Sequence, residues 1–542
     1  MPGRSQAISQ LLQFFPAALA STIFLLFVAL TQQLSGAIEI QIGVNFTGST
    51  SEIDVFANPA DANGAVGPTH YVEFINGRFA VYNKTNGLRL LHLTDTAFWN
   101  AAGISLPDGY SVSDPRLVFD PAANRWFTAQ IDYRLVSENT NRLLLAVSTS
   151  ADPTAQWKAL AIAGDPSNRN FADFPTLGVS SDAVCLAATF FDLAAGNPVG
   201  STLISIPKSD LLALNPSAAR RTTFSPLPQD THGFVLQPAV HLDPTPGNLT
   251  VLATPTGGHD FRPQTNLLRF TIHNPANPSS ATLSTPVLIP VPAFNIPINP
   301  PQPSGLSNLD NGDSRFSSSV CHAGNLLYAV HGSQIDNRAA LQWYKLDNES
   351  GSLLQSGTIT DPSLHFFYPA IAANTNGQVV IAFNACGPTT FVSSFAAAAE
   401  TIHGVTTFGP PVLLKAGLAS YNLPGLDGTS RWGDYSAINV DPADSSRFWS
   451  IQMVATATSR WSTQITELRL VARPMLQLTK NAGLITLAWP ATPNLFRLEI
   501  STNLTLPTAW MLFPTPPTSN AGFLSITLPA TGRHEFFRLK FP

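Results

Sequence analysis

Three arginines occupy corresponding positions in separate parts of this 542-residue chain, each at or just before a short apolar segment. They are Arg116, Arg315 and Arg431. A guanidinium group binds a carboxylate through two parallel hydrogen bonds, so three converging arginines would form a site for an anionic ligand. Each arginine also has an aspartate two or three residues away, and such local pairs would instead brace neighbouring elements. These aspartates are Asp114, Asp313 and Asp434.

Aspartates at this level of the pattern admit three roles. Paired carboxylates act as acid and base in hydrolysis, which makes Asp434, with its neighbour Tyr435 as a nucleophile, the catalytic candidates. A ring of carboxylates binds Ca²⁺ through oxygen ligands, which makes Asp61 and Asp313 the metal-ligand candidates. Aspartate also caps turns in β proteins, a purely structural use. The candidate ligand-binding residues are Arg116, Arg315, Arg431, Asp114, Asp173 and Trp432.

Other chemistries lack their motifs in the sequence. No two of the 11 histidines have His-x-His or His-x-x-x-His spacing, which argues against a zinc hydrolase. Neither a Gly-x-Ser-x-Gly motif nor a phosphate-binding glycine loop occurs. A net charge of -5 without a basic stripe argues against nucleic acid as a partner. Three tryptophans would form a sugar-stacking platform if they were exposed, or core packing if they were not. These are Trp126, Trp432 and Trp449.

A repeat runs through most of the chain and would position these residues. A short apolar strand, a turn with Asp, Asn or Gly, and a second apolar strand recur about every 40–80 residues. Each unit offers about four short strands, and sheets packed radially bury one another's faces while ring closure leaves few open edges. The prediction is an all-β protein, a β-propeller of about seven blades over residues 45–473. The copies begin near Gly64, Pro115, Pro175, Pro238, Ser318, Pro369 and Tyr435.

Composition and the remaining segments agree with an all-β fold. Lysine supplies only 7 of 29 cations and glutamate only 9 of 34 anions, whereas helices favour both residues. Residues 475–542 alternate as about six short strands, which predicts a small β-sandwich. The stretch Thr285–Asp313 holds seven prolines and is expected to be a long loop across one face. The best helical candidate is Ser209–Ala219.

The N-terminus predicts export. Arg4 is followed by an apolar run from Phe14 to Leu30 and then by small residues ending at Ala37, the pattern of a signal peptide over residues 1–37. The alternative is an uncleaved anchor, although a 17-residue run that contains Pro16 is short for a membrane span. We expect a secreted, periplasmic or cell-surface protein, monomeric, with no stable membrane span after cleavage.

Several motifs resemble those of known exported propellers. Ser150-Ala-Asp152-Pro-Thr-Ala-Gln-Trp157 resembles the Asp-box hairpin of sialidase-type propellers, with Ser, Asp and Trp in place. The segments that start at Asp61, Leu309 and Arg431, and the C-terminal residues 496–539, resemble a largely uncharacterised group of exported bacterial proteins. The sialidase resemblance implies an arginine triad for a substrate carboxylate and a tyrosine nucleophile. The chain departs from that pattern because no glutamate lies near Tyr435 in sequence.

Two functions from different classes follow. The first is an exported binding protein that uses a propeller face for a glycan or an envelope or extracellular ligand. The second is a sialidase-like or other glycan-active hydrolase with the arginine cluster at the channel mouth. The sequence leaves the enzyme question open, and Ca²⁺ is its only candidate cofactor.

Overall fold

A computed structural model describes residues 38–134, 140–241, 247–255, 262–303, 307–425, 427–472, 474–491, 496–504, 509–530 and 534–540. The predicted signal peptide lies outside the described residues. The chain divides into a larger unit, Ile40–Ala398 with Pro410–Leu470, and a smaller unit that includes Ala399–Gly409 and Val471–Pro542. A search of the described helices finds none long and apolar enough to cross a membrane.

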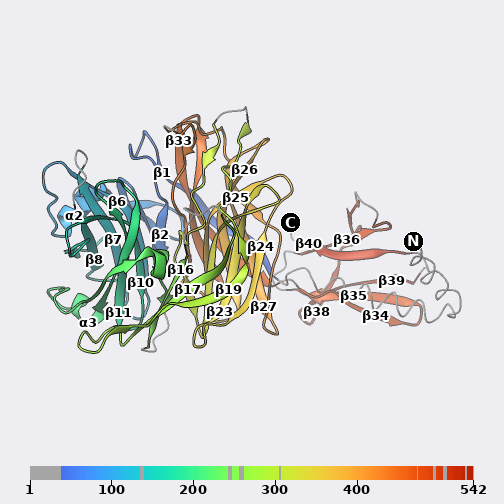
Figure 1. Ribbon diagram of the computed structural model, residues 1–542. Helices are drawn as coiled ribbons and strands as arrows, with labels where there is room; N and C mark the ends of the chain where they lie inside the picture. Colours follow the sequence, from blue (N-terminus) through green and yellow to red (C-terminus); the bar gives the residue numbers. More distant parts are fainter. Residues whose placement is uncertain are drawn as a thin grey trace, which may run out of the picture. The chain divides into compact units, whose positions relative to one another are not determined.

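The described strands of the larger unit form seven antiparallel groups that we call blades 1 to 7, and blades 3 and 5 are joined through β15 (Val240–His241) into one nine-stranded sheet. Figure 1 shows how these strands are arranged. Blade 1 comprises β2 (Asn63–Val66), β3 (His70–Ile75), β4 (Arg78–Asn83) and β5 (Arg89–Leu93). Blade 2 comprises β6 (Tyr110–Asp120), β7 (Arg125–Arg134), β8 (Arg142–Ser148) and β9 (Trp157–Ala163). Blade 3 comprises β10 (Asn170–Val179), β11 (Ala183–Asp192), β12 (Pro198–Pro207) and β13 (Thr222–Pro228).

The second half of the ring repeats this order. Blade 4 comprises β14 (Phe234–Pro238), β16 (Leu249–Thr254), β17 (Gln264–His273), β18 (Thr282–Leu283) and β19 (Val287–Phe294). Blade 5 comprises β21 (Cys321–Ala323), β22 (Leu326–Ile335), β23 (Arg338–Asp347) and β24 (Leu353–Ile359). Blade 6 comprises β25 (His365–Ala373), β26 (Gln378–Gly387), β27 (Thr390–Ile402) and β29 (Val412–Lys415). Blade 7 comprises β31 (Ala437–Val440), β32 (Arg447–Ala457), β33 (Arg460–Ala472) and β1 (Ile38–Thr50). The predicted β-propeller is confirmed.

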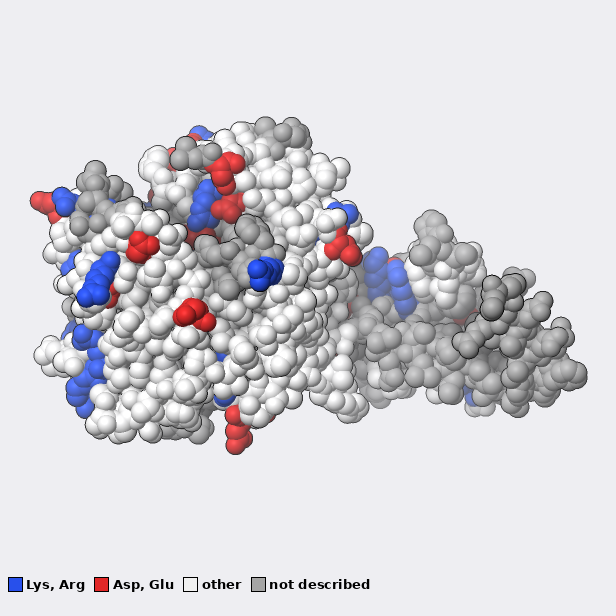
Figure 2. Space-filling model, in the orientation of Figure 1, with Lys and Arg blue, Asp and Glu red and all other residues white. Residues whose placement is uncertain are grey.

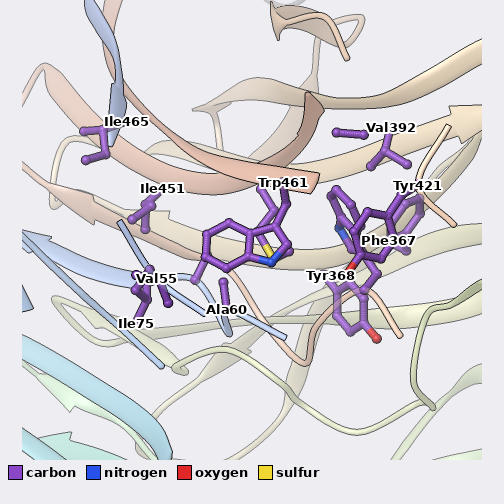
Figure 3. Close-up of a cluster of buried hydrophobic side chains, with 14 of the residues drawn as sticks. Val55, Ala60, Ile75, Phe367, Tyr368, Val392, Tyr421, Ile451, Trp461 and Ile465 are labelled. Atoms are coloured by element: carbon purple, nitrogen blue, oxygen red, sulfur yellow. The ribbon is translucent and has the colours of Figure 1, made fainter. Parts of the chain in front are cut away.

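Apolar side chains between neighbouring sheets hold the blades together. One core cluster joins blades 1 and 2, a second joins blades 2 and 3, and others join blades 3 and 4 and blades 4 and 5. The largest runs through blades 6, 7 and 1, where Phe367, Ile75 and Trp461 come from the three different blades (Figure 3). Strand β22 of blade 5 packs against β25 of blade 6. Every blade therefore contacts the next, and the ring is closed.

Closure of the ring depends on a strand that is remote in sequence. Blade 7 takes its three inner strands from residues 437–472 and its outer strand from β1, in the order β1-β33-β32-β31. Glu73 of blade 1 is fully buried beside this joint. Its carboxylate accepts hydrogen bonds from the backbone N–H and the hydroxyl of Ser49 in β1, from the Tyr82 hydroxyl at 2.8 Å and from Thr463 of β33. One side chain therefore ties β1 and β33 of blade 7 to blade 1.

The inner strands are not seven-fold symmetric. Strand β15 (Val240–His241) follows β14 and lies between β10 of blade 3 and β21 of blade 5, parallel to both. The fourth copy of the repeat also starts earlier than predicted, since its inner strand begins at Phe234 rather than near Pro238. On this side, hydrogen bonds between inner strands close the wall of the channel.

Three local expectations need correction. The proline-rich stretch is a loop only in part, because Val287–Phe294 forms an outer strand of blade 4, and an edge strand tolerates proline. The helix expected at Ser209–Ala219 is the short α3 (Lys208–Leu211). The sequence prediction missed α2 (Asp95–Ala101), whose cap is Thr94: its hydroxyl accepts from the N–H of Ala97. A further short helix, α4, spans Gln229–His232.

The smaller unit contains two facing sheets. One has the order β34-β35-β39-β38 and the other β37-β36-β40. Leu487, Trp489 and Ile526 of the first share a core with Phe496, Leu498 and Leu539 of the second. The end of β27 and β28 (Val405–Phe408) form a hairpin that also belongs to this unit. The strands are β34 (Gln477–Asn481), β35 (Leu484–Pro490), β36 (Arg497–Ser501), β37 (Met511–Leu512), β38 (Thr518–Asn520), β39 (Phe523–Pro529) and β40 (Phe536–Lys540).

Ring closure through Glu73 is testable. The substitution Glu73→Ala removes an acceptor shared by four buried donor groups, of which the Ser49 N–H keeps a second acceptor in Thr463. We expect the free energy of unfolding of the propeller to fall by about 2–4 kcal/mol in urea denaturation. The exposed Glu349→Ala is the control and should change it by less than about 0.5 kcal/mol. Equal midpoints for Glu73→Ala and the wild type would show that the network contributes nothing to closure.

Candidate functional site

The inner strands share a backbone irregularity where they begin. In blades 2, 3, 4 and 6 the pairing with the next strand skips two residues, one of which has a positive φ of 47° to 62°. Asp61, just before the inner strand of blade 1, has a φ of 49°. A bulge of this kind turns backbone groups away from their own sheet, so these groups need partners elsewhere. The four bulge residues are Asp114, Phe174, Val235 and Tyr368.

Side chains just after these positions supply the partners from the neighbouring blade. We call them the inner ring: Asn63, Arg116, Thr176, Gln237 and Ser436. Thr176 donates to the carbonyl of Leu236 at 2.7 Å, and Gln237 donates to that of Phe316 at 2.7 Å. The N–H of Leu117 donates to Asn63, and Ser436 donates to the carbonyl of Tyr368. The inner ring therefore links blades 1 with 2, 3 with 4, 4 with 5, and 6 with 7.

Arg116 spans more of the channel than any other inner-ring side chain. From blade 2, its Nε donates to the Pro175 carbonyl of blade 3 at 2.8 Å, and its Nη1 donates to the Ser317 carbonyl beside blade 5 at 2.9 Å. Its Cζ lies 3.6 Å from the ring centroid of Tyr435, beside blade 7. Arg116 is 4% exposed, so its guanidinium group is a buried cross-piece at the channel axis. It forms no ion pair within the described part of the chain.

The other two arginines lie at the same end and are paired. Arg315 binds Asp313 through Nε and Nη2, and its guanidinium group lies 4.8 Å from the Phe174 ring, which Arg116 also contacts. Arg431 binds both carboxylate oxygens of Asp434 at 2.7 Å and also reaches Asp310. The structure thus brings the three arginines to one end of the channel, with the guanidinium groups of Arg315 and Arg431 occupied by aspartates.

Four aspartates from blades 1, 2, 3 and 7 approach one another beside these arginines. Burial, and then the charges of Asp434 and Asp114, raise the pKa of Asp61 well above its ordinary value. Burial, and then the charges of Asp173 and Asp434, raise the pKa of Asp114 from 3.8 to about 7. The pKa of Asp173 is raised chiefly by burial. These four aspartates and two of the arginines form what we call the charged cluster: Asp61, Asp114, Asp173, Asp434, Arg315 and Arg431.

The two aromatic candidates, Tyr435 and Trp432, are buried and hydrogen-bonded within the chain. The hydroxyl of Tyr435 donates to the carbonyl of Pro115 at 3.1 Å, and burial raises its pKa well above its ordinary value, which disfavours the nucleophilic phenolate. Trp432 is 1% exposed, and its Nε1 donates to the side chain of Asn384. Trp126 and Trp449 are likewise buried, so the three tryptophans pack in the core and leave no stacking surface among them.

The metal candidates do not form a metal site. Asp61 accepts hydrogen bonds from Asn76 at 2.9 Å and from the N–H of Asp434, whereas Asp313 is bound by Arg315. The described residues contain no group of three or more His, Cys, Asp or Glu side chains that could hold a metal ion. The pocket beside Asp313, Tyr368 and Asp434 has a volume of about 10 Å³, which is at the limit for a single water molecule.

A much larger cavity lies in the channel beyond the inner ring. Its volume is about 440 Å³, within the range of about 300–1,000 Å³ that is usual for ligand sites. The lining comes from β2, β6, β15, β21, β25 and β31 and extends from the inner-ring residues Asn63, Arg116 and Ser436 to the loops at the far ends of these strands. Exposed residues of these loops border it: Pro121, Thr375, Pro442 and Ser445. Of the predicted ligand-binding residues only Arg116 lines this cavity, whereas Arg315, Arg431, Asp114, Asp173 and Trp432 do not.

Three buried polar atoms that belong to residues of this lining have no hydrogen-bond partner among the described residues. They are Nη2 of Arg116, Oγ of Ser318 and Oδ1 of Asn439. Buried polar groups are normally paired, because desolvation of an unpaired group costs about 1–3 kcal/mol. Ser318 and Asn439 were not singled out from the sequence, since a serine and an asparagine in β-strand segments carry no distinctive signal.

The hairpin that resembles an Asp-box lies between β8 and β9 of blade 2. Asp152 accepts the N–H of Thr154 at 2.9 Å, Ser150 accepts the N–H of Asp152, and Trp157 is 6% exposed. The turn is therefore capped by Asp152, and Trp157 is buried. These features describe one turn and carry no activity.

Comparison with known proteins adds no family. No protein-family model and no curated protein matches the chain. Cobalt-substituted Synechocystis ACO has 15% identity and a TM-score of 0.37, with 72% of this chain and 79% of that chain covered. The Dos1 propeller has 8% identity and a TM-score of 0.36, with 78% and 94% covered. Drosophila Semaphorin 1b has 7% identity and a TM-score of 0.36, with 80% and 87% covered. Similarities this low carry no functional argument.

The charged cluster predicts a pH-dependent stability. Because the pKa of Asp114 is higher in the folded chain, the folded state binds its proton more tightly than the unfolded state. The resulting stabilisation is present below about pH 4 and is lost as the pH rises to about 7, at about 1.4 kcal/mol per pKa unit. Asp114→Asn keeps a residue suited to a φ of 62° and removes the titration. In urea denaturation, we expect the wild type to lose more free energy of unfolding than this variant when the pH rises from 5 to 8.

The exposed Asp108→Asn is the matched control and should follow the wild type at both pH values. If Asp114→Asn loses stability between pH 5 and pH 8 as steeply as the wild type, the assigned origin of the slope is wrong.

Proposed function

We propose that this protein is an exported, non-catalytic binding protein whose ligand enters the central channel of the propeller. The observation that carries the proposal is the cavity of about 440 Å³ that begins at exposed loops and whose lining residues include Arg116, Ser318 and Asn439, each with a buried polar atom that has no partner among the described residues. A pocket of this size with a few polar groups on an otherwise apolar wall is typical of a small-molecule site. Export is supported by the apolar run from Phe14 to Leu30 and the small residues that end at Ala37.

The ligand class follows from the size and lining of the cavity. Its outer part carries amide and hydroxyl groups from Asn374, Thr375, Asn439 and Ser445. Such groups suit a single sugar residue or a small constituent of the cell envelope, with apolar contacts deeper in the channel. We therefore place the predicted glycan or envelope ligand in the channel rather than on the face that bears the charged cluster.

A glycan-active hydrolase is the weaker alternative. Two nearby carboxyl groups of raised pKa, Asp61 and Asp114, would suit acid catalysis. Both are buried behind Asn76 and Arg431, and the adjoining pocket of about 10 Å³ is too small for a sugar ring. The arginines that would bind a substrate carboxylate are paired with Asp313 and Asp434.

A panel of monosaccharides, short glycans and envelope constituents tests the proposal by thermal shift. We expect at least one compound to raise the melting temperature of the wild type and to leave that of Ala437→Phe unchanged, because Ala437 is a half-buried residue of the lining and a larger side chain there narrows the channel. The matched control is Ala101→Phe, an exposed alanine outside the channel, which should respond like the wild type.

Glycosidase assays on the same compounds complete the test. Turnover of a glycoside that Asp434→Ala abolishes would overturn the non-catalytic assignment. Stabilisation that persists in Ala437→Phe would place the ligand outside the channel and overturn the proposed site.

A further inference from the structure

We propose that the ligand of the channel cavity is a small carboxylate with an apolar body, whose carboxylate is bound at the inner end by Arg116 and Ser318. This inference rests on the proposed function, since it names the chemistry of the molecule held in the same cavity.

The first argument is a contrast among the three arginines. The guanidinium groups of Arg315 and Arg431 bind carboxylates of the chain itself. Arg116 is at least as buried, yet it has no carboxylate partner in the described ranges and uses two nitrogens on backbone carbonyls. Its Nη2 is buried without a hydrogen-bond partner among the described residues, and Arg116 is one of the residues at the inner end of the cavity. A buried guanidinium group without a counter-ion is best completed by an anion.

The second argument is a second donor at the same level. Ser318 is 5% exposed and lines the cavity, and its Oγ has no partner among the residues described. It directly follows Ser317, whose carbonyl accepts Nη1 of Arg116 at 2.9 Å. The backbone contact thus fixes the Arg116 guanidinium group beside the segment that carries the serine hydroxyl. One N–H and one O–H from different blades suit the two oxygens of a carboxylate.

The third argument is the wall between this end and the exposed loops. The middle of the cavity is lined mainly by small aliphatic side chains, among them Ala65, Val320, Ile371, Ala372 and Ala437. These groups offer apolar contact and no charge. A ligand that is anionic at one end and aliphatic along its length matches this order of polar and apolar groups.

The charges near the opening do not oppose such a ligand. Asp441 lines the outer part of the cavity, but Lys84 neutralises it at 2.8 Å and Trp449 donates to its second oxygen at 3.0 Å. On the side of the inner ring away from the cavity, Asp114 interacts electrostatically with Arg116, but the two side chains form no ion pair. Arg116 is therefore the charged side chain of the lining that remains without an oppositely charged partner of its own.

Octanoate is the probe, and octan-1-ol is its neutral counterpart of the same chain length. We expect isothermal titration of the full chain to show octanoate binding at least about tenfold tighter than octan-1-ol, because only the carboxylate pairs its own charge with the guanidinium group through charge-assisted hydrogen bonds. Ser318→Ala should weaken octanoate binding about tenfold, and Arg116→Lys by at least as much. Ala437→Phe should abolish it.

Ser450→Ala is the matched control for Ser318→Ala. Ser450 is also a buried serine whose hydroxyl lacks a partner in the described part of the chain, but it lies in β32 and does not line the cavity. Its removal should leave octanoate affinity unchanged. Loss of affinity in Ser450→Ala to the same extent as in Ser318→Ala would overturn the assigned role of Ser318.

The remaining outcomes separate the two proposals. Equal binding of octanoate and octan-1-ol, both lost in Ala437→Phe, would overturn the carboxylate inference and leave the channel as a binding site. Octanoate binding that survives in Ala437→Phe would overturn the inference by placing the probe elsewhere. If neither probe binds while a glycan stabilises the wild type but not Ala437→Phe, the inference fails and the proposed function stands.

Discussion

The propeller depends on how its innermost strands begin at a crowded axis. Bulges at these starts turn backbone carbonyls out of their own sheets, and a buried carbonyl without a donor destabilises the fold. The inner ring satisfies several of them by donation from a neighbouring blade, as in the contacts of Thr176 with the Leu236 carbonyl and of Ser436 with the Tyr368 carbonyl. The same bonds fix one blade against another. One set of side chains therefore both satisfies the backbone groups of the bulges and holds neighbouring blades together.

This arrangement explains the unusual charge composition. The chain is only 12% charged, and a large share of its arginines and aspartates serve internal contacts. On the face seen in Figure 2, charged side chains lie scattered in ones and twos over a mostly uncharged surface. Arginine suits the axis better than lysine, because its fork of donors reaches carbonyls on two other blades at once, as Arg116 does. Asp434 and Tyr435, the predicted catalytic residues, also make hydrogen bonds within the chain.

The sequence was sufficient for the fold and insufficient for the site, and the reason is physical. Blade number follows from the alternation of short apolar strands and turns, a local pattern. The partners of Arg116 are backbone carbonyls 59 and 201 residues away, and a carbonyl has no sequence signal. Local pairing was predictable for Arg315 and Arg431 because their aspartates lie two or three residues away. The cavity escaped prediction because it is formed by small residues from several blades.

The strand that completes blade 7 sets a condition on biogenesis. Residues of β1 pair with β33, so hydrogen-bonded neighbours such as Ser49 and Thr463 are 414 residues apart in the chain. Blade 7 can therefore be completed only after β33, one of the last strands of the ring, has been synthesised. Until then the nascent propeller is an open arc with unsatisfied edges at both ends. A ring that closes only at this late stage exposes unpaired strand edges for longer, which creates a need for protection against aggregation during folding.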